Sequence, residues 1–148
     1  MIYFNFLGKD KITIIPFNQD VIDIWNTSNG IDTGALIKSI ESEIVSGATN
    51  IYDSSIQALR ILDGESDDYN VSIVLMTDGL SNYGNLQSLR EVYRSLKREI
   101  PIYSIMFGDT DSSQLKKIAD LTNAKVFDGR AEHADGEYRH RAIHRAGP

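Results

Sequence analysis

The sequence contains no cysteine, and its three histidines, His133, His140 and His144, all lie near the C-terminal end. The absence of cysteine excludes disulfides, thiolate metal sites and cysteine nucleophiles. Because residues 1–130 contain no histidine, a Ser-His-Asp relay and a histidine-ligated zinc site are excluded from that part of the chain. Any chemistry there depends on carboxylates, hydroxyls, amides and backbone groups, which as ligands suit hard cations such as Mg²⁺.

The chain also lacks an excess of basic residues and a long apolar run. It has 15 Lys and Arg against 21 Asp and Glu, a formal net charge of −6. A nucleic-acid binder that neutralises phosphates is expected to be basic, so nucleic acid is not an expected partner. No stretch reaches the ~18 consecutive apolar residues that span a bilayer, so direct membrane insertion is not expected either.

The length of 148 residues and the hydrophobic fraction of 41% are sufficient for one domain with a core. We assign this domain to residues 1–130. Residues 131–148 contain one aliphatic side chain besides alanine, Ile143, and cannot bury a helical stripe. We therefore expect an unstructured tail there, of frame-shifted or vector-derived origin.

The first half of the chain predicts a β-hairpin followed by two helices. Two β-rich runs, residues 11–17 and 21–25, flank a turn-forming triplet at 18–20. Helical spacing then predicts one helix that ends at Gly47 and a second over Ile51–Leu62. The apolar stripe of the first helix consists of Leu36, Ile37, Ile40 and Ile44.

The second half alternates strands and helices. Residues 71–76 are the most apolar run, typical of a central parallel strand that is covered on both faces. An amphipathic helix at 85–99, a strand at 100–107, a helix capped by Asp111 or Ser112, and a short strand at 125–127 follow. This order predicts a doubly wound α/β fold with a parallel sheet and right-handed crossovers.

Ligands of open parallel sheets bind at the carboxyl ends of the strands, where Asp78 and Gly79 follow the most apolar strand. The loop that opens the second helix brings Thr49 and Asn50 toward the same crevice. A cation site is one interpretation of these residues. The other is local structure, with Asp78 in a turn and Asn50 capping the helix while Asp53 reaches back. Spacing alone favours local structure.

Four segments occur in the order found in one known family: GATNIY at 47–52, IVLMTDG at 73–79, IPIYSIMFG at 100–108 and KVFDGR at 125–130. Together they resemble a von Willebrand factor type A domain over about residues 8–130. The sequence is similar in particular to bacterial proteins in which such a domain follows a solute-binding-protein-like domain. The resemblance implies a Rossmann-like α/β fold and suggests an extracytoplasmic or envelope-associated location.

The resemblance also implies a metal-ion-dependent adhesion site, which holds Mg²⁺ or Mn²⁺ in intact members of the family. Thr49 and Asp78 match two of its five ligands. The other three come from an Asp-x-Ser-x-Ser loop after the first strand, and this motif is absent. We therefore expect an incomplete site with weak or no metal binding, and a partner-binding rim formed by Asn50, Gly79 and Asp109.

The family's first strand and last helix are the parts that the resemblance leaves unmatched. That strand is central in the family's sheet, between the runs at 11–17 and 71–76, and residues 4–8 resemble the end of the helix that follows it. Without it, two strand edges lack hydrogen-bond partners. We expect the chain to close this gap itself, to form a homodimer by strand exchange, or to obtain the strand from elsewhere.

The predicted function is a non-enzymatic protein-interaction module. In an intact relative, the cation bridges to an acidic side chain of a protein partner, because the ion reverses the local sign of charge. One alternative is a metal-independent scaffold fragment, which the missing ligands favour. Another is a metal-assisted phosphohydrolase, which is disfavoured because no phosphate-binding glycine loop and no general base near Asp78 can be identified.

Overall fold

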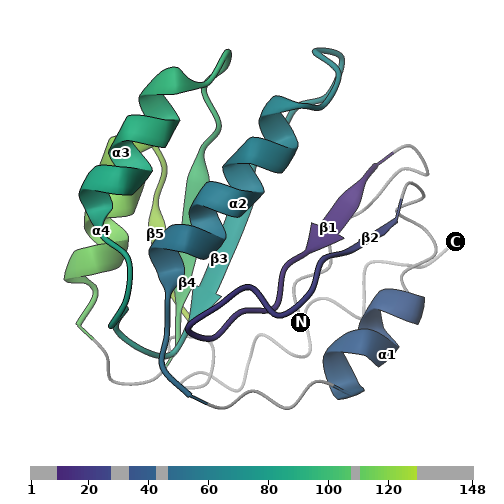
Figure 1. Ribbon diagram of the computed structural model, residues 1–148, viewed down its shortest axis with the longest axis horizontal. Helices are drawn as coiled ribbons and strands as arrows, with labels where there is room; N and C mark the ends of the chain where they lie inside the picture. The colour runs from purple at the N-terminus through teal and green to yellow at the C-terminus, as the bar shows by residue number, and fades with distance from the viewer. Residues whose placement is uncertain (1–9, 28–33, 43–46, 108–110, 130–148) are drawn as a thin grey trace, which may run out of the picture.

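A computed structural model of the chain describes residues 10–27, 34–42, 47–107 and 111–129 (Figure 1). Within these ranges, β1 (Ile12–Ile14) and β2 (Trp25–Thr27) form an antiparallel pair. A separate sheet consists of β3 (Ile73–Thr77), β4 (Ile102–Met106) and β5 (Val126–Asp128). None of the helices in the described ranges is long and apolar enough to cross a membrane.

The three-stranded sheet is parallel, in the order β3-β4-β5. Helix α3 (Leu86–Ser95) connects β3 to β4, and α4 (Ser113–Leu121) connects β4 to β5. Helix α2 (Ile51–Asp63) precedes β3 and packs beside α3. The alternation predicted from residue 71 onward is therefore confirmed, and the fold is α/β and Rossmann-like.

The core lies between this sheet and helices α2, α3 and α4. Apolar residues at helical spacing point from each helix toward alternate residues of the strands, which is the pattern that buries one face of each element. The fully buried side chains of the core are Ile51, Leu59, Leu89, Ile100, Ile102 and Ile118. Burial of this face is the main stabilising contribution to the fold.

The opposite face of the sheet is only partly covered, which corrects one prediction. The run at 71–76 was expected to be covered on both faces, yet Val74 is 41% exposed and Met76 is 51% exposed. The register places Tyr103 and Phe127 on the same open face, where their rings lie 6.5 Å apart between centroids. The prediction was wrong because the three packed helices of the described ranges all lie against the other face.

The hairpin forms, but its second strand is displaced from the predicted position. Val21 makes only an isolated bridge with Phe17, and the ladder resumes at Trp25, which pairs with Ile14. Two local features explain the shift. Pro16 cannot donate a ladder hydrogen bond, and the carboxylate of Asp23 accepts hydrogen bonds from the Ile24 amide and the Trp25 indole, both at 2.7 Å.

Helix α1 (Gly34–Ser42) forms where a helix was predicted, but its apolar stripe is largely exposed. Leu36 is buried, whereas Ile37 is 46% exposed and Ile40 is 51% exposed. The helix lies against β2 of the hairpin and not against the main core, so too little apolar surface is available to cover the stripe. Ile44 and the predicted helix end before Gly47 fall outside the described residues.

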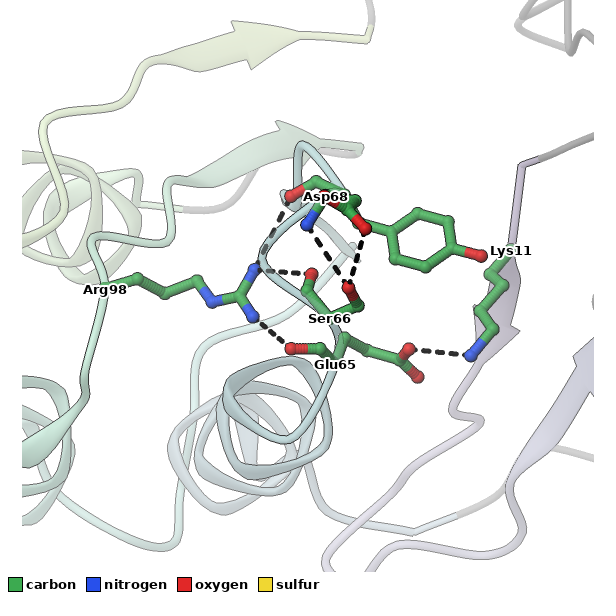
Figure 2. A network of polar contacts seen from close by, with 6 residues as sticks. Lys11, Glu65, Ser66, Asp68 and Arg98 are labelled. Carbon is green, nitrogen blue, oxygen red and sulfur yellow. Dashed lines mark hydrogen bonds and ion pairs between the residues drawn. The ribbon is translucent and has the colours of Figure 1, made fainter.

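Arg98 fixes the turn between α2 and β3 (Figure 2). Its guanidinium donates hydrogen bonds to the backbone carbonyls of Glu65, Ser66 and Tyr69. On the other side of this turn, Lys11 Nζ lies 2.7 Å from Glu65 Oε2. These contacts attach the start of β1 and the chain before β4 to the carboxyl end of α2.

Candidate functional site

Helix α2 begins at the carboxyl end of β3 with a buried cap. Asn50 Oδ1 accepts a hydrogen bond from the Asp53 amide at 3.1 Å, and Asn50 Nδ2 donates to Asp53 Oδ2 at 2.7 Å. The same Nδ2 donates to the Gln19 carbonyl, and the Asn50 amide donates to the Asn18 carbonyl. Asn50 is 5% exposed, so its side chain caps the helix and holds the hairpin turn. The capping interpretation of Asn50 and Asp53 is therefore confirmed.

Ser81 attaches the loop after β3 to the start of α2. Its Oγ accepts from the Ile51 amide at 3.1 Å, and its single proton is shared between the carbonyls of Tyr83, at 2.8 Å, and Thr49, at 3.2 Å. The Asn82 amide also donates to the Thr49 carbonyl. The backbone on both sides of the crevice is thereby fixed by one hydroxyl and one neighbouring amide.

Gln114, in the first turn of α4, holds the same loop from the opposite side. Its Oε1 accepts from the Ser81 amide at 2.7 Å, and its Nε2 donates to the Ser81 carbonyl at 3.1 Å. A side-chain amide that pairs with both backbone groups of one residue fixes the position of that residue. Sequence reasoning missed Ser81 and Gln114, because a serine in a polar loop and a glutamine in a helical first turn carry no distinctive pattern.

The two residues carried over from the family lie on adjoining loops. A Cβ placed on Gly79 would meet Thr49 Oγ1 at 3.3 Å, so the threonine hydroxyl packs against the residue that follows Asp78. Gly79 allows this close approach because it has no side chain. Thr49 is half-buried, and Asp78 is exposed at the mouth of the crevice. The loops that carry Thr49 and Asp78 therefore adjoin at Gly79.

Whether a metal ion fits at this crevice depends on the number and type of side chains that are available as ligands. From the family's ligand set, the described loops supply the Thr49 hydroxyl, which lies against Gly79, and the carboxylate of Asp78, the residue before Gly79. No group of three or more acidic or histidine side chains in the described ranges is placed to hold a metal ion. Mg²⁺ requires near-octahedral coordination and is held by protein through one or two carboxylates plus other ligands. Two side chains do not make a complete protein site for this ion.

The remaining predicted rim residues differ in placement. Gly79 lies on the crevice rim and is partly exposed. Asn50 is buried beneath the rim, and Asp109 falls outside the described residues. Nearby, Leu80 is 41% exposed and Tyr83 is 50% exposed. The loop after β3 therefore presents both an acidic and two apolar side chains.

The start of α4 lies close to this rim and carries a perturbed carboxylate. Asp111 accepts hydrogen bonds from Ser113 Oγ and from the Ser113 amide, both at 2.8 Å. These two bonds, the side-chain one first, lower the pKa of Asp111 below its ordinary value of 3.8. Ser112, the N-cap by position, makes no side-chain capping bond. Of the two predicted caps, Asp111 therefore provides the side-chain hydrogen bonds.

The parallel sheet, with helices α2 and α4 starting at the carboxyl ends of its strands, defines a Rossmann-like α/β domain. In such domains, ligands bind in the crevice at the carboxyl ends of the strands. The sequence model described as von Willebrand factor type A domain matches residues 5–134. The chain therefore belongs to the von Willebrand factor type A family, and the resemblance seen in the sequence is confirmed. Membership indicates a protein-interaction module. No curated protein and no solved structure matches the chain significantly.

Proposed function

We propose that this chain is a non-enzymatic protein-interaction module whose contact surface is the loop at 78–83 together with Thr49. The observation that carries the proposal is the fixation of this loop by Ser81 and Gln114, which holds Asp78, Leu80 and Tyr83 in place while leaving them exposed. A surface that is already ordered loses little conformational entropy on binding. The partner we propose presents an acidic side chain flanked by apolar ones.

An acidic partner requires a cation, because Asp78 alone repels a second carboxylate. We propose that Mg²⁺ or Mn²⁺ binds here weakly, with the Thr49 hydroxyl and the Asp78 carboxylate as the side-chain donors of this chain and water completing the coordination. The bound ion reverses the local sign of charge and so permits contact with the partner's carboxylate. Leu80 and Tyr83 then contact its apolar neighbours.

Titration with Mn²⁺ tests the cation part of the proposal. We expect the paramagnetic ion to broaden the amide NMR signals of Thr49, Asp78 and Gly79 selectively, at concentrations on the order of millimolar, because the protein donors are few. Asp78→Ala abolishes the effect. Asp120→Ala, which removes an exposed carboxylate on α4, leaves it unchanged. Broadening centred on the acidic turn at 63–68, or no broadening at all, contradicts the cation site and favours a metal-independent scaffold.

Selection of displayed peptides in the presence of Mg²⁺ tests the interaction part. We expect selected peptides to share an acidic residue next to apolar ones, and to lose affinity for the double variant Leu80→Ser, Tyr83→Ser. The variant Ile37→Ser is the control, because Ile37 is similarly exposed on α1. Peptides that bind all forms equally contradict the proposed surface, and turnover of a phosphate ester by the pure protein contradicts the non-enzymatic assignment.

A further inference from the structure

Three Asp-Gly pairs lie in the described part of the chain, at residues 63–64, 78–79 and 128–129. In such a pair the backbone nitrogen of glycine can attack the side-chain carboxyl carbon of aspartate, because glycine has no side chain to hinder the approach. The nitrogen must first lose its proton, so an amide that is held in a hydrogen bond reacts only when that bond opens. The hydrogen bond of each glycine amide therefore determines which pair reacts.

The glycine amides of two pairs belong to regular structure. The Gly64 amide donates to a carbonyl of the last turn of α2 at 3.2 Å. The Asp63 carboxylate is held as well, because its Oδ1 accepts a hydrogen bond from the Lys97 amide at 2.9 Å. The Gly129 amide donates to the Met106 carbonyl at 2.8 Å, which extends the ladder between β4 and β5. Either amide is freed only when part of a helix or of the sheet opens.

The Gly79 amide, in contrast, is held within its own turn. It donates to the Thr77 hydroxyl, two residues earlier, at 3.2 Å, and the same hydroxyl donates to the Gly79 carbonyl at 3.1 Å. Neither bond connects Gly79 to another strand or helix, and the hydrogen bonds that fix the crevice loop begin two residues later, at Ser81. Opening of this one turn is therefore enough to free the Gly79 amide, beside an aspartate that is exposed to water.

We propose that Asp78 is a site of spontaneous isomerisation to isoaspartate, and that the Thr77 hydroxyl limits the rate. The Gly79 nitrogen forms a bond to the side-chain carboxyl carbon of Asp78, while the amide proton and the carboxyl hydroxyl leave as one water molecule. Addition of water to the resulting succinimide ring then breaks one of its two bonds to nitrogen. Breaking the new bond restores aspartate, and breaking the original peptide bond gives isoaspartate with no net change in atoms.

Isomerisation changes the surface proposed above for partner binding, and this consequence rests on the proposed function. The backbone gains one carbon between residues 78 and 79, and the free carboxylate is then carried directly by the α-carbon. Gly79 lies so close to Thr49 that a Cβ on the glycine would meet Thr49 Oγ1 at 3.3 Å, so a longer backbone alters this contact. We therefore expect the isoaspartyl form to lose the Mn²⁺ binding proposed for Thr49 and Asp78.

Peptide mapping of the aged protein tests the site of modification. The intact protein is incubated at physiological temperature and pH for several weeks and digested, and electron-transfer fragmentation then locates isoaspartate at individual residues. We expect isoaspartate to accumulate at Asp78 at least about tenfold faster than at Asp63 and Asp128, because the glycine amides that follow those two residues open less often. A smaller difference, or no isoaspartate at Asp78, overturns the proposal.

Two substitutions of Thr77 test what limits the rate. Thr77→Val removes the hydroxyl and keeps the shape of this buried side chain, whereas Thr77→Ser keeps the hydroxyl. We expect isoaspartate to form at Asp78 at least about threefold faster in the valine variant than in the serine variant, because the Gly79 amide loses its acceptor. A smaller difference contradicts the role of the hydroxyl. If Thr77→Val unfolds the protein, Asp63 and Asp128 accelerate as well, and the ratio in the parent protein alone then decides the question.

Titration of the isoaspartyl form with Mn²⁺, after its chromatographic separation, tests the consequence for binding. We expect Mn²⁺ to broaden the amide NMR signal of Thr49 in the unmodified protein and not in the isoaspartyl form. Equal broadening in the two forms overturns the proposed consequence. No broadening in either form contradicts the cation site of the proposed function instead, and peptide mapping still decides whether Asp78 is the residue that isomerises.

Discussion

At the scale of single residues, the side chains of Asn50 and Ser81 each make several hydrogen bonds that connect different segments of the chain. Asn50 caps α2, pairs with Asp53 and holds the hairpin turn at Gln19. Ser81 joins the crevice loop to the same helix. Thr49, in contrast, does not cap the helix, and its hydroxyl lies against Gly79 in the crevice. Asn50 and Ser81 therefore hold the site together, whereas the Thr49 hydroxyl lies in the crevice where a ligand binds.

Replacing Asn50 tests the contribution of its buried contacts. Asn50→Ala removes the cap and leaves the Gln19 carbonyl without this donor, so we expect a loss of about 2–3 kcal/mol in the free energy of unfolding. Asn85→Ala removes an otherwise similar cap from α3, where the side chain is exposed and accepts from the Ser88 amide at 2.9 Å. There we expect about 1 kcal/mol. Urea denaturation measures both, and equal losses contradict the added contribution of burial.

Asp111 gives the start of α4 a dependence on pH. Its pKa is lowered in the folded state, so its contribution to stability is present above the ordinary value of 3.8 and is lost as the pH falls through the lower folded value. We expect Ser113→Ala, which removes the main cause, to raise the pKa of Asp111 toward 3.8 in an NMR titration of its carboxyl carbon. Ser112→Ala is the control, because Ser112 makes no capping bond. A pKa unchanged by Ser113→Ala contradicts the assignment.

At the scale of elements, the sequence predicted the bounds of helix α2 more accurately than the burial of strand β3. Helix α2 was expected over Ile51–Leu62 and is found at Ile51–Asp63, because its apolar period and its asparagine cap both lie within the segment itself. The apolar run of β3 was also found, but sequence could not show which of its faces is covered. Coverage depends on where the connecting helices lie, and a continuous apolar run is compatible with one or two covered faces.

Two substitutions in β3 test its asymmetric burial. Leu75 is 4% exposed under the helices, and we expect Leu75→Ala to lower the free energy of unfolding by about 2–4 kcal/mol. Val74 is 41% exposed on the open face, and we expect Val74→Ala to cost less than about 1 kcal/mol. Thermal or urea denaturation measures the difference. Comparable losses at both positions indicate that the open face is covered in solution.

At the scale of the whole molecule, a few long-range polar contacts connect elements that are far apart in the chain. Arg98, before β4, binds three carbonyls of the turn that follows α2, while Lys11 binds Glu65 of the same turn from the hairpin (Figure 2). The Arg98 side chain is 17% exposed, so its hydrogen bonds are partly shielded from water. Its ion pair with the fully exposed Asp67 contributes little by comparison.

Removal of Arg98 tests this long-range connection. We expect Arg98→Ala to lower the free energy of unfolding by about 1.5–3 kcal/mol, since it leaves carbonyls of the turn without their charged donor. We expect Lys97→Ala, the neighbouring substitution of an exposed side chain, to stay within about 0.5 kcal/mol. Chemical denaturation followed by circular dichroism measures both. Equal effects show that Arg98 acts only as a surface charge.

The sequence by itself determined the α/β class, the order of elements from residue 71 onward, and the position of Asp78 after a buried strand, because apolar period and turn residues are local properties of the chain. It also carried the ordered segments that mark the von Willebrand factor type A family. Only the tertiary structure decided which face of the sheet is open, that Thr49 meets Gly79, and that Ser81 and Gln114 fix the crevice. These features join residues separated by about thirty positions, and such contacts depend on how the helices pack and not on any pattern within one segment.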